Sequence, residues 1–140
     1  MKTVARLPRL VIPAGAQEKA VYVDVRPAKA VILDAASSRE HDLTLELDVE
    51  AEHSPEAFYQ VFVGRRNVGN VALYGAGIRS EAHGEFHPAH VQLIVTEAVA
   101  EALRADPARA VTIRFVPNAT PKAALTIDKA EIVLGPRLRE

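Results

Sequence analysis

The sequence predicts an all-β fold, an antiparallel β-sandwich of about six to eight strands with one short helix. Three observations support this prediction. Apolar and polar residues alternate with a period of two in several segments, which is the pattern of a strand with one buried and one exposed face. Segments rich in Gly, Pro, Asn and Ser recur every ~10 to 20 residues, as turns do in a sandwich. Only one segment shows a helical period.

Taken in order, the 140 residues fit a single folding unit behind a short N-terminal segment. Residues 1–20 are expected to form an N-terminal strand or the remnant of a linker, and residues 21–140 the sandwich domain. Strands are predicted over residues 21–25, 43–50, 58–64, 110–117 and 123–134. Turns are predicted at Pro13–Gly15, Ala35–Ser38, His53–Pro55, Gly64–Asn67 and Pro117–Pro121. In the second strand, Leu43, Leu45 and Leu47 alternate with polar residues, so we expect one dry and one wet face.

The segment from Thr96 to Ala105 predicts the helix. Its apolar stripe consists of Val95, Val99, Ala102 and Leu103. Thr96 can cap the start, Glu97 favours the positive end of the helix dipole, and Pro107 helps to stop the helix. A helix this short is not stable alone in water, so we expect it to plug one open end of the sandwich.

Composition excludes several classes of function. The formal net charge is −1, which gives no electrostatic reason to expect nucleic acid or an anionic membrane as partner. The apolar stretches are far shorter than the roughly 20 residues that span a bilayer. Residues 1–12 lack the apolar run of a signal peptide, so a cytoplasmic location is expected. Cysteine is absent, which excludes disulfides, thiolate catalysis and Cys-based metal sites.

Three histidines are the candidate metal ligands. His83, His87 and His90 are spaced by four and three residues, a spacing that could form a metal site on a helix, but an intervening glycine and proline argue against a helix. Two interpretations stay open. The histidines form a metal site in a loop, which Glu85 could join, or they belong to a polar surface loop.

No pair of groups has both the identity and the spacing for catalysis. The chain contains no Gly-x-Ser-x-Gly elbow and no phosphate loop. Its carboxylates fall on the predicted wet faces of strands. We therefore expect no enzymatic activity and no cofactor in this chain.

The glycine-rich segment from Gly69 to Gly77 carries the candidate binding residues. Its glycines bracket Leu73 and Tyr74 and permit tight backbone paths. Either the loop presents one of these apolar side chains outward, or both belong to an ordinary core strand.

The order of these segments resembles the C-terminal domain of tyrosinases and plant polyphenol oxidases. Tyr59-Gln60-Val61 stands where the family usually has Phe-Asp-Val, and residues 69–74 resemble its next strand. Residues 93–103 resemble the family's helix segment. Residues 111–117 resemble its Val-Thr-Leu-Val-Pro, and residues 125–132 its closing strand. The resemblance covers residues 21–134.

The resemblance implies a β-sandwich behind a helical domain that holds two copper ions through six histidines. Such a domain does no chemistry. It covers the copper site of the catalytic domain, in cis or in trans, and keeps it latent by placing a bulky side chain in the substrate cavity. By position, Leu73 or Tyr74 would be that plug, and the copper would belong to the partner. The alternatives are a stand-alone β-sandwich that binds a metal such as copper through residues 83–90, or an oligomerisation or adhesion module.

Overall fold

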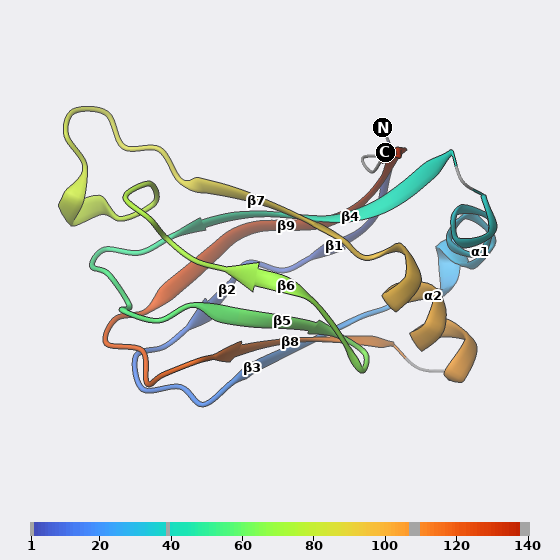
Figure 1. The fold of residues 1–140 in the computed structure, drawn as a ribbon, viewed down its shortest axis with the longest axis horizontal. Coiled ribbons are helices and arrows are strands. Elements are labelled where there is room, and N and C mark those ends of the chain that lie inside the picture. Colours follow the sequence, from blue (N-terminus) through green and yellow to red (C-terminus); the bar gives the residue numbers. More distant parts are fainter. Residues whose placement is uncertain (1, 39, 107–109, 138–140) are drawn as a thin grey trace.

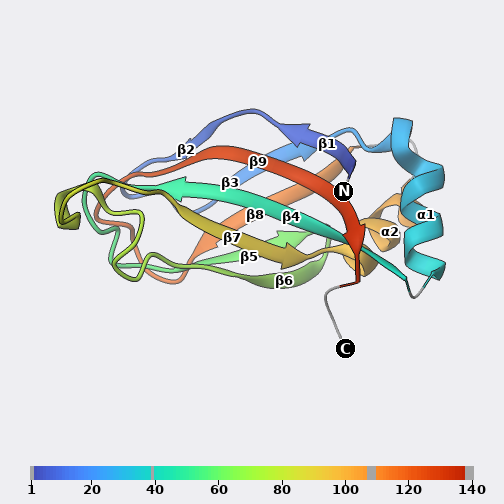
Figure 2. The same cartoon turned by 90° about the horizontal axis from the view of Figure 1, so that it is seen from above.

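The computed structural model describes residues 2–38, 40–106 and 110–137. Within these residues the chain forms nine strands, which make two antiparallel sheets packed face to face (Figure 1). This arrangement confirms the predicted β-sandwich. Two α-helices cover one end of the sandwich and long loops form the other end, as the view from above also shows (Figure 2).

The larger sheet has the strand order β1-β9-β4-β7, with β2 also paired to β9. Its strands are β1 (Lys2–Leu7), β2 (Leu10–Ile12), β4 (His41–Glu50), β7 (Ala89–Ile94) and β9 (Leu125–Pro136). The smaller sheet has the order β3-β8-β5-β6. Its strands are β3 (Lys19–Val23), β5 (Tyr59–Val63), β6 (Arg66–Val71) and β8 (Val111–Pro117). β1 and β2 lie in the first 20 residues and pair with β9, while the predicted boundary at residue 20 stays a prediction.

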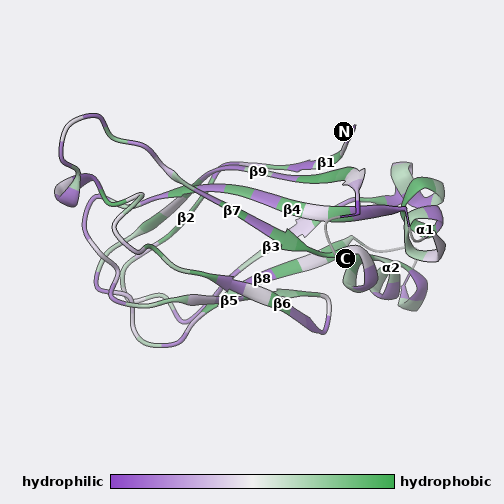
Figure 3. Ribbon diagram, turned by 45° about the horizontal axis from the view of Figure 1, so that its top comes forward, coloured by the Kyte–Doolittle hydropathy of each residue, from purple (hydrophilic) through white to green (hydrophobic). Residues whose placement is uncertain are grey.

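The core lies between the two sheets and follows the predicted alternation. The inward side chains of β4, Leu43, Leu45 and Leu47, are fully buried. Figure 3 shows that hydropathy changes along the strands. This is expected because successive side chains of a strand point to opposite faces of the sheet. The outer face of β4 is drier than expected, because Thr44 and Glu46 are only 7% and 9% exposed. β4 lies between β9 and β7, whose side chains flank this face.

The helix α2 (Thr96–Ala105) has the predicted bounds and packs against α1, β4, β5 and β8 at one end of the sandwich. The predicted cap was wrong: Val95 is the N-cap residue and no side chain caps the helix. The Thr96 hydroxyl instead accepts a hydrogen bond from the amide of Leu43 and donates one to Asp42, both at 2.9 Å. Thr96 already lies inside the helix, so its side chain faces β4. Glu97 lies in the first turn as predicted, and Pro107 lies outside the described residues.

A second helix, α1 (Lys29–Ser37), was not predicted. It follows the 3-10 turn η1 (Arg26–Ala28), and the turn expected at Ala35–Ser38 was wrong because the helix continues through Ser37. Ile32 and Ala35 are buried on one face, and α1 contacts α2. Alanine-rich segments favour helix, and here tertiary packing against α2 stabilises one. Among the described residues, no helix has the length and apolar character needed to cross a membrane.

Tyr59 in β5 is a buried tyrosine whose hydroxyl finds no hydrogen-bond partner among the described residues. The residue is 1% exposed, and burial raises the pKa of its hydroxyl to about 12. Removing a polar group that is buried without a partner relieves a desolvation cost of roughly 1–3 kcal/mol. We expect Tyr59→Phe to raise the free energy of unfolding by about 1 kcal/mol in urea titrations. A loss of stability would contradict this and would indicate an ordered water on the hydroxyl.

Candidate functional site

The most exposed large hydrophobic residue of the described chain is Tyr74, at 89% exposure. It lies in the loop of residues 72–78, which follows β6 at the loop end of the sandwich. On its two sides, Leu73 packs against the core and Ile78 is 2% exposed. The loop is therefore anchored by two apolar side chains, and between them Tyr74 points into solvent.

Backbone contacts fix this loop to the end of β4. The amide of Ala51 donates to the carbonyl of Gly77 at 2.8 Å, and the amide of Arg79 donates to the carbonyl of Ala51 at 2.9 Å. Ala51 and Ile78 thus form a parallel bridge. This bridge is isolated and brings the backbone of Gly77 close to the end of β4.

Gly77 has a backbone conformation that favours glycine, with φ of +84°. A Cβ at this position would lie 3.0 Å from Leu73 Cδ2 and 3.1 Å from both Ala89 Cβ and the Val49 carbonyl oxygen. Gly75 has a similar φ of +87°, but no atom lies within 4 Å of the point that a Cβ would occupy there. At Gly77, therefore, both the backbone conformation and the close packing favour glycine. At Gly75 only the backbone conformation does.

The 3-10 turn η2 (Arg79–Glu81) continues the loop and is held by Arg79. The guanidinium of Arg79 lies 3.0 Å from the carboxylate of Glu50 and 4.1 Å from the centre of the Phe86 ring. A cation over an aromatic face at an exposed site contributes about 0.5–1 kcal/mol. Arg79 therefore links residues 79–86 to the end of β4.

A cleft of about 250 Å³ lies beside Tyr74. Residues from three loops line it: Ser54, Pro55, Glu56, Ala57, Phe58, Ala72, Leu73, Tyr74 and Asn118. The Asn118 side-chain oxygen accepts a hydrogen bond from the backbone amide of Phe58 at 2.8 Å. The backbone amide of Asn118 donates to the Phe58 carbonyl at 2.9 Å. These two bonds join two of the three loops, and the third, which carries Tyr74, is fixed by its bonds to Ala51.

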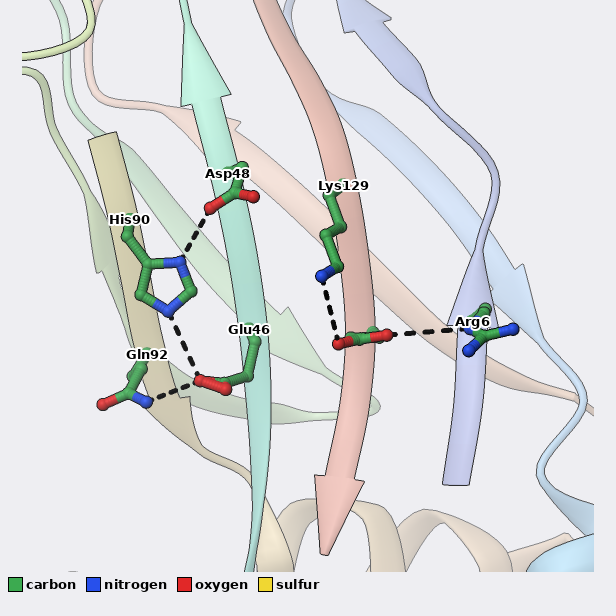
Figure 4. A network of polar contacts seen from close by, with 7 residues as sticks. Arg6, Glu46, Asp48, His90, Gln92 and Lys129 are labelled. Atoms are coloured by element: carbon green, nitrogen blue, oxygen red, sulfur yellow. Dashed lines mark hydrogen bonds and ion pairs between the residues drawn. The ribbon is translucent and has the colours of Figure 1, made fainter. Parts of the chain in front are cut away.

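The structure does not bring the three candidate histidines together. His90 lies on β7, where its Nδ1 is 2.7 Å from Asp48 and its Nε2 is 3.4 Å from Glu46 (Figure 4). His83 and His87 are exposed in the loop before β7, and His87 lies 4.0 Å from Glu85. Among residues 2–38, 40–106 and 110–137, no group of three or more His, Cys, Asp or Glu side chains is placed to hold a metal ion. The pleat of β7 directs His90 to the carboxylates of β4, away from the loop.

His90 belongs to a polar network on the outer face of the larger sheet (Figure 4). Glu46 also accepts a hydrogen bond from Gln92 of β7 and lies opposite Glu131 of β9. Glu131 in turn lies 3.7 Å from both Lys129 and Arg6. Two carboxylates directly opposite each other repel, and the surrounding donors and cations offset this repulsion. The network links β7, β4, β9 and β1 and has a structural role.

The hydrogen bond with Asp48 raises the pKa of His90, with a smaller contribution from Glu46, while partial burial acts in the opposite direction. A raised pKa in the folded state stabilises the fold below the unfolded value of 6.5, and this stabilisation is lost as the pH rises through the folded value. We expect His90→Gln to lower the melting temperature more at about pH 5.5 than at about pH 8.5. Equal losses at the two pH values would contradict protonation of His90 in the folded state.

Other sequence predictions also have clear outcomes. The turn predicted at Gly64–Asn67 is the β5–β6 hairpin, and Arg66 reaches Glu101 of α2 at 2.8 Å.

The sequence left open whether Leu73 and Tyr74 lie in the core. In the structure Leu73 packs against the core and Tyr74 is exposed to solvent. Phe58 and Asn118 shape the cleft, but the sequence carries no functional signal for them: Phe58 opens a predicted strand and Asn118 lies inside a predicted turn.

No family model and no curated protein matches this chain. Solved structures similar to it include two latent enzymes. A latent aurone synthase, a polyphenol oxidase from natural source, has a TM-score of 0.49 and 10% identity, and the match covers 99% of this chain and 26% of that chain. A latent apple tyrosinase has a TM-score of 0.37 and 16% identity over 94% of this chain and 26% of that chain. The chain therefore spans about a quarter of the length of either protein, and similarity at this level supports no statement about function.

Proposed function

We propose that this domain is a non-catalytic lid. It would cover the dicopper site of a tyrosinase-like catalytic domain, in cis or in trans, and keep that site latent with Tyr74 in the substrate cavity. The observation that carries the proposal is the 89% exposure of Tyr74 in a loop that Leu73 and Ile78 anchor. The sequence resemblance supplies the class of partner, and the copper would belong to that partner.

The geometry favours Tyr74 over Leu73 as the plug. Leu73 packs against the core, so moving it into a partner would cost the burial it already has. Tyr74 loses almost no intramolecular contact when it enters a cavity. Its ring can bury a large area at a low cost in side-chain entropy, which is why tyrosine is frequent at binding hot spots. Its side chain is also a phenol, the class of compound that a polyphenol oxidase accepts.

Loop anchoring supports the same role. A plug on a fixed loop is already ordered before it binds, so less conformational entropy is lost on association. A lid in the same chain also acts at a high effective concentration, so modest contacts suffice to keep a site covered. β1 starts and β9 ends at the helix end of the sandwich, far from the loop end (Figure 1). In cis, the catalytic domain would therefore have to extend alongside the sandwich.

The proposal is tested by adding the domain to a cap-free, tyrosinase-type catalytic domain from the same source and measuring diphenol oxidation. Wild-type domain should inhibit, and Tyr74→Ala should inhibit about 30-fold more weakly, as loss of a binding hot spot of about 2 kcal/mol predicts. Tyr22→Ala is the matched control, because Tyr22 is 70% exposed on β3, on the outer face of the smaller sheet. Unchanged oxidation at saturating wild-type domain, or equal inhibition by Tyr74→Ala, would refute the proposal.

A further inference from the structure

The cleft beside Tyr74 has walls that suit a side chain better than a cofactor. Tyr74 and Leu73 come from one loop, and Pro55 and Phe58 from another. Its volume of about 250 Å³ lies below the range of roughly 300–1,000 Å³ that is usual for small-molecule and cofactor sites. These four side chains give the cleft an apolar wall, while Ser54, Glu56 and Asn118 add polar groups to its lining. Hydrogen bonds between Phe58 and Asn118 fix two of its three loops, and bonds to Ala51 fix the third, so an apolar side chain can pack on this wall without a rearrangement of the loops.

The loop end around the cleft carries an excess of negative charge, which favours a partner surface with positive charge. Residues 13–18, 50–58, 72–88 and 118–124, which form the loop end, contain six glutamates against one arginine and one lysine. Arg79 lies 3.0 Å from Glu50, and Lys122 lies 3.5 Å from Glu56. Both cations of the loop end thus already have a carboxylate partner, and its excess charge is negative.

Two of the remaining glutamates belong to segments that are joined by a backbone hydrogen bond. The amide of Ser80 donates to the carbonyl of Glu52 at 2.9 Å, which places the backbone of Glu52 beside η2, the turn that also contains Glu81. Both residues are exposed, and neither forms an ion pair within the described part of the chain. Neither lines the cleft, but Glu52 lies in the same loop as the lining residues Ser54 and Pro55, and we call Glu52 and Glu81 the acidic rim. Complementary charge at the edge of an interface increases association rates and selects partners.

We propose that this cleft accepts an apolar side chain that projects from a basic segment of the catalytic partner, beside the cavity that receives Tyr74. This inference rests on the proposed lid function and adds to it the chemistry of the partner surface. Tyr74 would enter the partner, and a partner side chain would enter the cleft behind Tyr74. Lysines or arginines flanking that side chain would face the acidic rim.

The acidic rim is tested with the full chain as inhibitor of the same cap-free catalytic domain, at about 20 mM and about 300 mM salt. Glu52→Gln/Glu81→Gln should weaken inhibition about tenfold at low salt and reduce its salt dependence, since each rim charge contributes a few-fold in affinity. Asp34→Asn/Glu97→Gln makes the same change in net charge on α1 and α2, at the opposite end, and should stay within about twofold of wild type.

The cleft is tested with Ala57→Leu, which narrows it with a larger side chain. This variant should inhibit about fivefold more weakly at both salt concentrations, with an unchanged melting temperature, because it removes room for an apolar side chain. Ala20→Leu, at an exposed position of β3, is the control. If the rim variant or the cleft variant inhibits like wild type while Tyr74→Ala is impaired, this inference is overturned and the lid function stands. If wild-type domain does not inhibit, both are overturned.

Discussion

Thr96→Val is expected to lower the free energy of unfolding by about 3 kcal/mol, although it changes the shape of the side chain very little. The hydroxyl of Thr96 accepts a hydrogen bond from the Leu43 amide and donates one to Asp42, and both contacts are buried. Asp42 is 2% exposed. Removing the hydroxyl leaves a buried amide without this acceptor and a buried carboxylate with one donor fewer, and each such loss costs roughly 1–3 kcal/mol.

Urea unfolding of three variants measures this effect. Thr96→Ser keeps the hydroxyl and should retain most of the stability that Thr96→Val loses. Thr112→Val is the control for the loss of a hydroxyl, because Thr112 is half-buried on β8 and no hydrogen bond of its side chain is present in the described residues. If Thr96→Val were as stable as Thr96→Ser, the link between α2 and β4 would not depend on these hydrogen bonds.

Gly77→Ala is expected to cost about 3 kcal/mol, through two separate terms. A side chain in the left-handed region of φ costs roughly 1–2 kcal/mol, and forcing a methyl group into packed surroundings costs roughly 1–3 kcal/mol. At φ of +84° the new Cβ would meet Leu73, Ala89 and the Val49 carbonyl at 3.0–3.1 Å. The backbone oxygen of Val49 belongs to β4 and cannot move aside.

Gly75→Ala separates these two terms. Gly75 has nearly the same φ, but open space surrounds its Cβ position, so this variant should cost only about 1–2 kcal/mol. Both are measured by chemical unfolding. Under the proposed function, Gly77→Ala should also weaken inhibition of the catalytic domain more than Gly75→Ala does, because it displaces the anchor of the Tyr74 loop. Equal losses of stability in the two variants would contradict the steric argument.

Much of the fold could be predicted from local pattern. The alternation in residues 43–50 identified β4 and its buried leucines, and the apolar stripe of residues 96–105 gave the bounds of α2. These predictions succeed because the period of side chains along a strand or helix is a local property. α1 was missed because its helical state depends on packing against α2, which lies about 60 residues further along the chain.

The sequence located the candidate site but did not decide which of its side chains is exposed. Glycines and apolar residues at positions 69–77 indicated a loop of interest, but the same pattern fits a core strand. The difference between Leu73 and Tyr74 is set by the bridge between Ala51 and Ile78 and by the close approach of Gly77 to β4. In the same way, His90 pairs with carboxylates 42 and 44 residues away in sequence, and no spacing among the histidines could show this.

The local sequence pattern is thus enough to predict two layers of antiparallel strands with a helix at one end. Each predicted strand carries its own alternation of apolar and polar residues, and the helix carries its own apolar stripe. Tertiary structure alone decides which aromatic ring faces solvent, which histidine is held by carboxylates and where the Thr96 hydroxyl binds. These outcomes depend on contacts between segments that are distant in sequence, and such contacts leave no period in either segment.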